Sequence, residues 1–128
     1  MDHMTELVLK DESYAIMGAC FEVYKEKGCG FLEDVYQECM ELEFTDQAIP
    51  SEAQKLHPLT YKGRSLSKTY RADLWCINQV IVGIKAVESL ADAHRSQVLN
   101  YLNVTGAKLG LLVNFGHSPQ LEWERIVK

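Results

Sequence analysis

The spacing of apolar residues changes at Ile49-Pro50, and this change restricts the fold more than any other feature of the 128-residue chain. Before it, apolar residues recur every three or four positions, as in amphipathic helices. After it, they alternate with polar residues or run without interruption, as in strands. The run from Leu109 to Phe115 is apolar enough for a strand buried on both faces. Two leading helices and a later set of strands predict a layered α/β domain.

The boundaries follow from turn residues and periodicity. Gly28 and Gly106 are natural helix stops. Helices are predicted over residues 11–27, 31–47 and 90–105. Strands are predicted over residues 53–61, 65–71, 70–76, 80–87, 109–115 and 121–127. The predicted order is therefore α-α-β-β-β-β-α-β-β, a single domain with a mixed central β-sheet flanked by helices.

Each leading helix has an expected apolar face. In the first helix the expected apolar residues are Tyr14, Met17, Cys20, Phe21 and Tyr24. In the second helix they are Leu32, Val35, Cys39 and Leu42, beside a polar row of Asp34, Glu38 and Glu41. The apolar residues of both helices are expected to face the core.

Length and composition limit the protein class. The chain suits one domain, predicted over residues 10–128, after an N-terminal tail of residues 1–9. With 47% hydrophobic and 24% charged residues it has globular composition. It has no apolar run of about 20 residues and no secretory signal pattern. These features predict a cytoplasmic protein without a membrane partner.

The four cysteines do not form a recognisable metal or redox motif. They stand at positions 20, 29, 39 and 76, and no pair has the CxxC spacing. Cys20, Cys39 and Cys76 fall within apolar patterns and are expected to pack as small hydrophobes. Cys29, between two glycines, is expected to be exposed.

Charge is unevenly distributed along the chain. Residues 1–54 hold thirteen acids and three lysines, a net charge of −10. Residues 55–85 hold one acid, Asp73, and a net charge of +5. The basic residues of this segment other than Lys85 are Lys55, Lys62, Arg64, Lys68 and Arg71. Two interpretations stay open: a solvated hairpin, or a surface that faces phosphates.

Polar residues interrupt two predicted strands. Asp73 goes against strand propensity, and its structural explanation is an ion pair with Arg71 or Lys85. In the next strand, Ile81, Gly83 and Lys85 share one face. A hairpin through residues 77–79 brings these strands together, so Asp73 and Lys85 could share a site.

Two helices add further candidates. Gln97 and Tyr101 lie on one helical face, which His94 joins three positions earlier. The alternative is a solvated or capping surface. Near the start of the second helix, Gly30 as N-cap and Glu33 as third helical residue would form a capping box. The functional alternative is a Glu33 side chain that faces a site.

Taken together, these segments resemble the PD-(D/E)xK nuclease superfamily, and most closely its RecB and lambda-exonuclease branch. The chain also resembles the small bacterial GxxExxY family through Gly30, Glu33 and Tyr36. The other matching segments are Tyr70–Leu74, Lys85–Glu88, Gln97–Leu102 and Leu111–Gly116. The resemblance covers about residues 11–126 and implies a restriction-endonuclease-like domain.

The resemblance also implies roles for individual residues. Asp73, Glu33 and the backbone carbonyl of Ile84 would hold Mg²⁺ or Mn²⁺ through hard oxygen ligands. Lys85 would orient the attacking water and neutralise phosphate charge. Gln97 and Tyr101 would position the strand that is cut, or Lys85.

The remaining basic residues and one departure complete what the resemblance implies. Flanking phosphates would be held by Lys55, Lys62, Arg64, Lys68 and Arg71. The family's Glu-x-Lys is Gly83-Ile84-Lys85 here, so one metal carboxylate is missing.

Three hypotheses about function follow. The first is a metal-dependent nuclease acting on DNA, or on RNA. The second is an inactive nuclease-fold protein that binds nucleic acid or a protein partner. The third is an oligomeric module, such as a homodimer, built on the aromatic residues of the leading helices: Phe21, Tyr24, Phe31, Tyr36 and Phe44.

Overall fold

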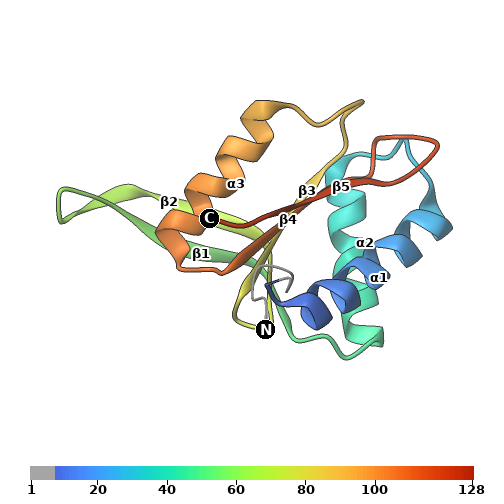
Figure 1. Ribbon diagram of the computed structural model, residues 1–128, viewed down its shortest axis with the longest axis horizontal. Helices are drawn as coiled ribbons and strands as arrows, with labels where there is room; N and C mark the ends of the chain where they lie inside the picture. Colours follow the sequence, from blue (N-terminus) through green and yellow to red (C-terminus); the bar gives the residue numbers. More distant parts are fainter. Residues whose placement is uncertain (1–7) are drawn as a thin grey trace, which may run out of the picture.

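The computed structural model describes residues 8–128, which form one five-stranded sheet with helices on both faces (Figure 1). The elements are α1 (Lys10–Lys27), α2 (Glu33–Asp46), β1 (Ser51–Tyr61), β2 (Arg64–Cys76), β3 (Val80–Lys85), α3 (Asp92–Thr105), β4 (Leu109–Asn114) and β5 (Glu122–Ile126). Among these helices none is long and apolar enough to cross a bilayer. The predicted tail, residues 1–9, lies mostly outside the described residues.

The sheet is mixed, as the sequence predicts. Its strand order is β1-β2-β3-β4-β5. The β3–β4 pair is parallel and is connected through α3, while the other neighbours are antiparallel. The helices α1 and α2 pack on one face, and α3 packs on the other (Figure 1). The α/β class and the single layered sheet are confirmed.

One predicted strand does not exist as a separate element. The segments 65–71 and 70–76 form a single strand, the 13-residue β2. The reason is that β1 pairs with β2 on both sides of Tyr70, from Cys76 down to Arg64. Neither Gly nor Pro interrupts this segment, so nothing breaks the strand. The observed order is α-α-β-β-β-α-β-β.

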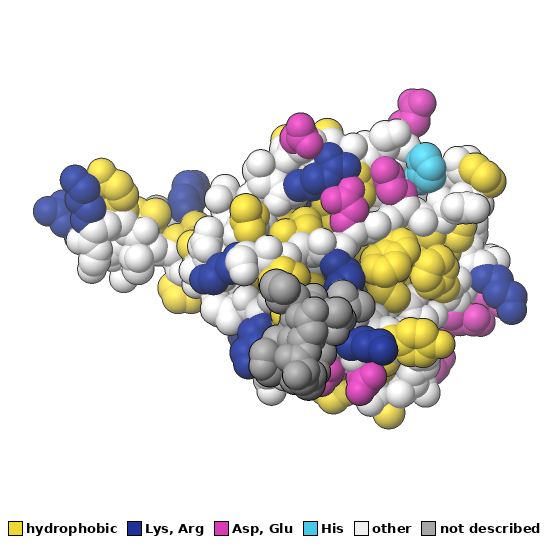
Figure 2. Space-filling view, viewed as in Figure 1, with side chains coloured by type: hydrophobic (Ala, Val, Ile, Leu, Met, Phe, Trp, Pro, Cys, Tyr) yellow, Lys and Arg dark blue, Asp and Glu magenta, His cyan; other side chains and the backbone are white. Residues whose placement is uncertain are grey.

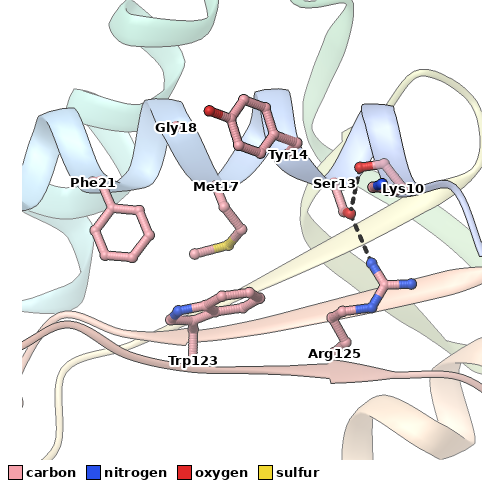
Figure 3. Close-up of a pocket in the computed structure, with 8 residues that line it drawn as sticks. All are labelled: Lys10, Ser13, Tyr14, Met17, Gly18, Phe21, Trp123 and Arg125. Carbon is pink, nitrogen blue, oxygen red and sulfur yellow. Dashed lines mark hydrogen bonds between the residues drawn. The ribbon is translucent and has the colours of Figure 1, made fainter. Parts of the chain in front are cut away.

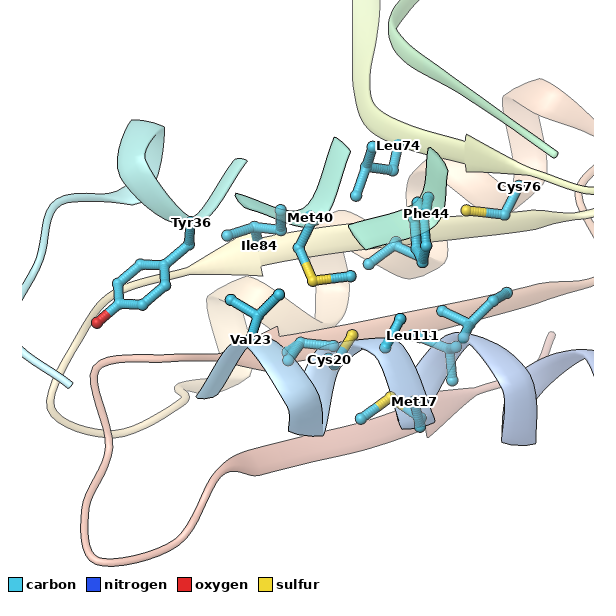
Figure 4. Close-up of a cluster of buried hydrophobic side chains, with 14 of the residues drawn as sticks. Met17, Cys20, Val23, Tyr36, Met40, Phe44, Leu74, Cys76, Ile84 and Leu111 are labelled. Carbon is cyan, nitrogen blue, oxygen red and sulfur yellow. The ribbon is translucent and has the colours of Figure 1, made fainter. Parts of the chain in front are cut away.

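The buried face of α2 is not the predicted one. Leu32 and Leu42 are 76% and 61% exposed, whereas Tyr36, Met40 and Phe44 are fully buried. The buried residues are spaced by four positions and bring the larger side chains into the core (Figure 4). The predicted row was wrong because this helix carries two apolar rows, and burial favours the row with more apolar area.

The first helix also differs in part from the prediction. Tyr14 is 83% exposed and Phe21 is 46% exposed, although Met17 and Cys20 are buried as predicted. The other buried apolar residues of α1 are Ile16, Ala19 and Val23. Among the remaining cysteines, Cys76 is buried, Cys39 is partly buried and Cys29 is exposed.

A buried asparagine fixes the end of β3. Asn114, which is fully buried, accepts hydrogen bonds from the backbone N–H of Val87 (2.9 Å) and of Gly116 (3.0 Å). Its side-chain amide donates to Glu122 Oε1 at 2.9 Å. The Phe115 N–H donates to the carbonyl of Lys85 at 2.8 Å. These bonds hold the backbone at Lys85 and just beyond it against β4.

We expect Asn114→Ala to lower the free energy of unfolding by about 2–4 kcal/mol. The substitution leaves two backbone N–H groups without their acceptor. Urea denaturation measures the change, and Asn103→Ala, at an exposed position of α3, is the matched control. Equal stability of the two variants would contradict the role given to Asn114.

Candidate functional site

Asp73 lies directly beyond the last residue pair that joins β2 to β3. Their ladder ends at Leu74–Val82, while β3 continues beside β4 as far as Lys85–Asn114. The N–H of Ile84 is therefore not used by β2 backbone, and it donates to Asp73 Oδ2 at 2.8 Å. The carboxylate thus occupies the gap that opens between the two strands.

The alternation of side chains along β2 also breaks at Asp73. Tyr70 and Ala72 pack with the cluster on the α3 side, whereas Leu74 and Cys76 pack with the cluster under α1 and α2. All four positions are even, so a regular strand would place them on one face. Opposite Asp73, Gln54 has a left-handed φ of 55° and is skipped in the pairing with β2. The β1–β2 ribbon is therefore kinked at Gln54 and Asp73.

Asp73 has no ion-pair partner among residues 8–128, which removes the structural explanation through Arg71 or Lys85. Burial is the largest influence on its carboxyl group and raises its pKa. The hydrogen bond from Ile84 and the charge of Lys85 lower that pKa, and the charge of Glu33 raises it. Two of the predicted site residues therefore act electrostatically on Asp73 with opposite sign.

Asp73 borders two hollows. The smaller one, of about 170 Å³, is lined by Tyr70, Arg71, Asp73, Gly83, Lys85, Gln97, Val98, Tyr101 and Leu112. The larger one, of about 360 Å³, is lined by Glu33, Asp34, Gln37, Gln54, Asp73 and Ile84. The structure therefore brings together all the predicted catalytic and metal-holding residues, on either side of one carboxylate.

The side chain of Glu33 borders the larger hollow and does not cap α2. The helix α2 begins at Glu33 itself, its N-cap is Leu32, and no side chain caps it. The predicted capping box is therefore wrong, because Glu33 is the first helical residue and not the third. The loop before it is held by Tyr36, whose hydroxyl donates to the Gly28 carbonyl at 2.6 Å.

Two residues that the sequence analysis missed complete this side of the site. Gln37 donates from Nε2 to the backbone carbonyl of Asp73 at 2.8 Å and to Glu41 at 3.1 Å. It lies one helical turn after Glu33, a spacing that could have indicated the shared face. Gln54 shares the larger hollow, but no sequence pattern marks its left-handed backbone.

The opposite side of the site is built on α3. Tyr101 stacks on Tyr70, with ring centroids 3.4 Å apart and an interplanar angle of 18°. Gln97 is one turn earlier and exposed, and both residues border the hollow that contains Lys85. His94, predicted to join this face, accepts a hydrogen bond from the N–H of Ala91 at 3.0 Å. It therefore caps the helix and does not line the hollow.

The five predicted phosphate-binding residues separate into two groups. Arg71 borders the smaller hollow, and Lys55 lies near the kink, 3.6 Å from Glu52. Lys62, Arg64 and Lys68 lie at or near the turn that joins β1 to β2, away from the hollows. The side chain of Ile84 is buried in the core, so only its backbone reaches the site.

The glycine at position 83 is not required by the backbone. A Cβ atom there would lie 3.7 Å from Leu112 and 3.8 Å from Val98, which is ordinary contact, and the φ angle of Gly83 is not left-handed. The site therefore lacks a third carboxylate because of the residue type, and not because the fold excludes one.

Within residues 8–128, no group of three His, Cys, Asp or Glu side chains is arranged to hold a metal ion. Glu33 and Asp73, however, border the same hollow. Magnesium is commonly bound by one or two carboxylates together with phosphate oxygens and water. The donor set therefore fits an ion shared with a phosphate ligand, and does not fit an ion held by protein alone.

A third hollow, of about 430 Å³, lies away from Asp73, between α1 and β5 (Figure 3). It is lined by Lys10, Ser13, Tyr14, Met17, Gly18, Phe21, Trp123 and Arg125. Its two charged residues lie at one end, and it contains no carboxylate. It is an apolar groove without the groups that the chemistry at Asp73 needs.

Comparison with known proteins identifies the family. A family model for the PD-(D/E)XK nuclease superfamily matches residues 10–126. The chain belongs to this superfamily. In the superfamily divalent metals are generally used, and nucleic acid is the general class of ligand. The match therefore supports a nuclease-superfamily domain over residues 10–126.

The fold has a counterpart among solved structures. The crystal structure of SSO0001 is similar, with a TM-score of 0.61 and 20% sequence identity. The similarity covers 75% of this chain and 50% of that chain, so this chain spans about half of its length. A search of curated proteins finds no match. At this identity the likeness shows a shared fold and nothing finer.

We expect Asp73→Asn to raise the free energy of unfolding at pH 7. Burial raises the pKa of Asp73, so the charged carboxylate is less favourable in the folded chain than in the unfolded chain. Stability of the unmodified protein therefore falls as pH rises from the ordinary Asp pKa of about 3.9 through the raised folded value. Asparagine keeps an acceptor for the Ile84 N–H and removes the charge.

Thermal unfolding at several pH values measures this effect. The gain should vanish below about pH 3, where the Asp73 carboxyl is protonated in both states of the unmodified protein. Asp34→Asn, at an exposed position on the rim of the same hollow, is the control and should give no gain. A lower stability of Asp73→Asn at pH 7 would contradict this account of Asp73.

Proposed function

We propose that the protein is a metal-dependent nuclease that hydrolyses phosphodiester bonds in DNA, with a site that lacks one carboxylate. The observation that carries the proposal is the position of Asp73 between two hollows. One hollow contains the second acid, Glu33, and the other contains Lys85. Hydrolysis of a phosphodiester needs anionic ligands for a cation and a positive group near the phosphate, and this arrangement provides both.

Asp73 and Glu33 are the side chains that would hold Mg²⁺ or Mn²⁺, and the Ile84 carbonyl would add a third oxygen. When bound, the ion supplies positive charge that stabilises the negative charge developing on the phosphate. The side-chain oxygen of Asp73 that does not bond to Ile84 remains available for this purpose. Gln37 holds α2 against the Asp73 carbonyl and so keeps Glu33 on the same hollow.

The protein groups on the α3 side act on the phosphate and on water. Lys85 neutralises phosphate charge and orients the attacking water through its ammonium group. Gln97 and Tyr101 position the strand to be cut by hydrogen bonding, and the stack with Tyr70 fixes the Tyr101 ring. Arg71, at the edge of the same hollow, holds an adjacent phosphate.

At the level of the subfamily, we assign the chain to the GxxExxY group within the RecB and lambda-exonuclease branch. Support comes from Tyr36, which holds the loop carbonyl of Gly28 while Glu33 begins the helix. In this interpretation the tyrosine of the motif fixes the loop before α2, and the fixed loop positions the glutamate at the start of the helix.

A second candidate is a nuclease-fold protein without catalysis that binds nucleic acid or a protein partner. Gly83 favours it, because the third carboxylate is absent although a Cβ atom would fit at that position. The net charge of −10 over residues 1–54 favours a basic protein partner for that half of the chain.

A homodimer remains a separate prediction. Tyr36 and Phe44, two of the aromatic residues that suggested it, are fully buried in the core of one chain. Phe21 is exposed and packs edge-on to Trp123 with ring centroids 6.5 Å apart, in the groove between α1 and β5. A dimer would therefore use that groove, and light scattering at increasing concentration would detect it.

We expect the protein to cut labelled DNA in the presence of Mg²⁺ or Mn²⁺, and Asp73→Asn to lower the rate on the order of 10²- to 10³-fold. The reason is that a cation contributes several kcal/mol to stabilisation of the transition state. Gly83→Glu should increase the rate, because it adds a carboxylate at a position whose backbone accepts a Cβ atom. The matched control is Asp34→Asn on the same rim.

The outcomes separate the two candidates. Cleavage that survives Asp73→Asn belongs to another site or to a contaminant, and contradicts the proposal. A silent protein whose Gly83→Glu variant cuts supports the inactive, binding candidate. Silence of both, with the fold intact by circular dichroism, contradicts the assignment of the site.

A further inference from the structure

The strands β1 and β2 extend beyond the body of the domain as a hairpin arm, here residues 56–71 (Figure 1). Beyond the kink at Gln54, β2 pairs with β1 alone, because its pairing with β3 is limited to residues 74–76. All residues from 60 to 69 are exposed. The outer part of the arm, residues 60–69, is therefore a two-stranded hairpin that packs on no other element and adds little to folding.

The arm is basic throughout and has a well-defined tip. Between Ala53 and Ala72 the sequence contains five basic residues and no acid. Dark-blue side chains mark the end of the arm in Figure 2, and the turn there consists of Lys62 and Gly63, with Arg64 next to it. Both turn residues have positive φ angles, 49° and 78°. This is the pattern of a type I′ turn, which matches the twist of the flanking strands.

The dimensions of the arm suit a groove of duplex DNA. From the Leu56–Arg71 pair to the turn, β1 runs about 20 Å, at about 3.3 Å per residue. The major groove of B-form DNA is about 12 Å wide and 8.5 Å deep, and it admits a two-stranded ribbon. The A-form groove of duplex RNA is deep and narrow. The arm is thus long enough to enter the major groove of duplex DNA and is poorly matched to the groove of duplex RNA.

The arm also bends near its base. The pairs Pro58–Thr69 and Thr60–Ser65 leave residues 66–68 of β2 opposite Leu59 alone. Such a bulge bends a ribbon and increases its twist. The bend lies between the tip and Asp73, and Arg64 is nine residues from Asp73 along the same strand. At about 3.3 Å per residue the tip is at most about 30 Å from Asp73, which is less than one turn of B-form DNA.

We propose that the hairpin arm inserts into the major groove of double-stranded DNA within one helical turn of the bond at Asp73, which makes duplex DNA the substrate class. The inference rests on the proposed nuclease function, because it uses the position of Asp73 to place the cut. It does not rest on catalysis, since the arm binds DNA whether or not the site is active. Lys62, Arg64 and Lys68 contact phosphates on both sides of the groove.

The test is binding in EDTA, measured by fluorescence anisotropy. The probes are a DNA duplex of two helical turns, one of its single strands, and an RNA duplex of the same sequence. The double variant Lys62→Asn/Arg64→Gln removes two charges at the tip, and asparagine tolerates the positive φ of position 62. The control Lys25→Gln/Lys108→Gln removes the same charge at exposed positions outside the arm.

We expect the tip variant to bind duplex DNA 10- to 100-fold more weakly at about 0.1 M salt, and the slope of log K against log salt to fall by about 1.8. The control should retain most of its affinity, and all proteins should unfold at similar temperatures. In hydroxyl-radical footprints the tip variant should lose protection, relative to the unmodified protein, at positions within one turn of the other contacts.

Equal affinity of the unmodified protein for the three probes, or equal weakening by the tip and control variants, would overturn the inference even if DNA is cut. Conversely, tip-dependent binding to duplex DNA without cleavage by any variant would leave the arm proposal standing while the nuclease proposal fails. The two failures are therefore distinguishable.

Discussion

The hydrogen bond from the Ile84 N–H to Asp73 Oδ2, 2.8 Å long, is the contact on which the site depends. A sheet that splits between two strands leaves a backbone N–H without its partner, and a buried carboxylate needs a donor. Each group satisfies the other, so the split and the acid stabilise one another. Without the Asp73 carboxylate, we expect β2 and β3 to pair further along their length, which would close the two hollows.

Other long-range contacts converge on the same point. Gln37 ties α2 to the backbone carbonyl of Asp73, and Asn114 holds the backbone just beyond Lys85 against β4. The acid of α2 and the lysine of β3 therefore approach Asp73 from elements that are each fixed independently. The charge of Glu33 raises the pKa of Asp73 and the charge of Lys85 lowers it.

The sequence predicted the parts of this structure that depend on local pattern. The alternation in β3 placed Gly83 and Lys85 on one face, and both border the same hollow. Prediction failed where distant residues decide. The choice between two apolar rows of α2 depended on the volume available in the core, and the length of β2 depended on continuous pairing with β1. Gln37 gains its role from a residue 36 positions away, which no local pattern records.

The absence of a carboxylate at Gly83 affects binding and cleavage in opposite directions. In the proposed site only Glu33 and Asp73 would act as acid ligands, so the hold on a cation would depend more on phosphate oxygens supplied by the nucleic acid. At the same time, one negative charge fewer beside Lys85 weakens the repulsion that a phosphate meets there. In the proposed nuclease, the glycine would therefore favour binding of nucleic acid over rapid cleavage. Because the backbone at position 83 accepts a side chain, this balance is set by one residue and not by the fold.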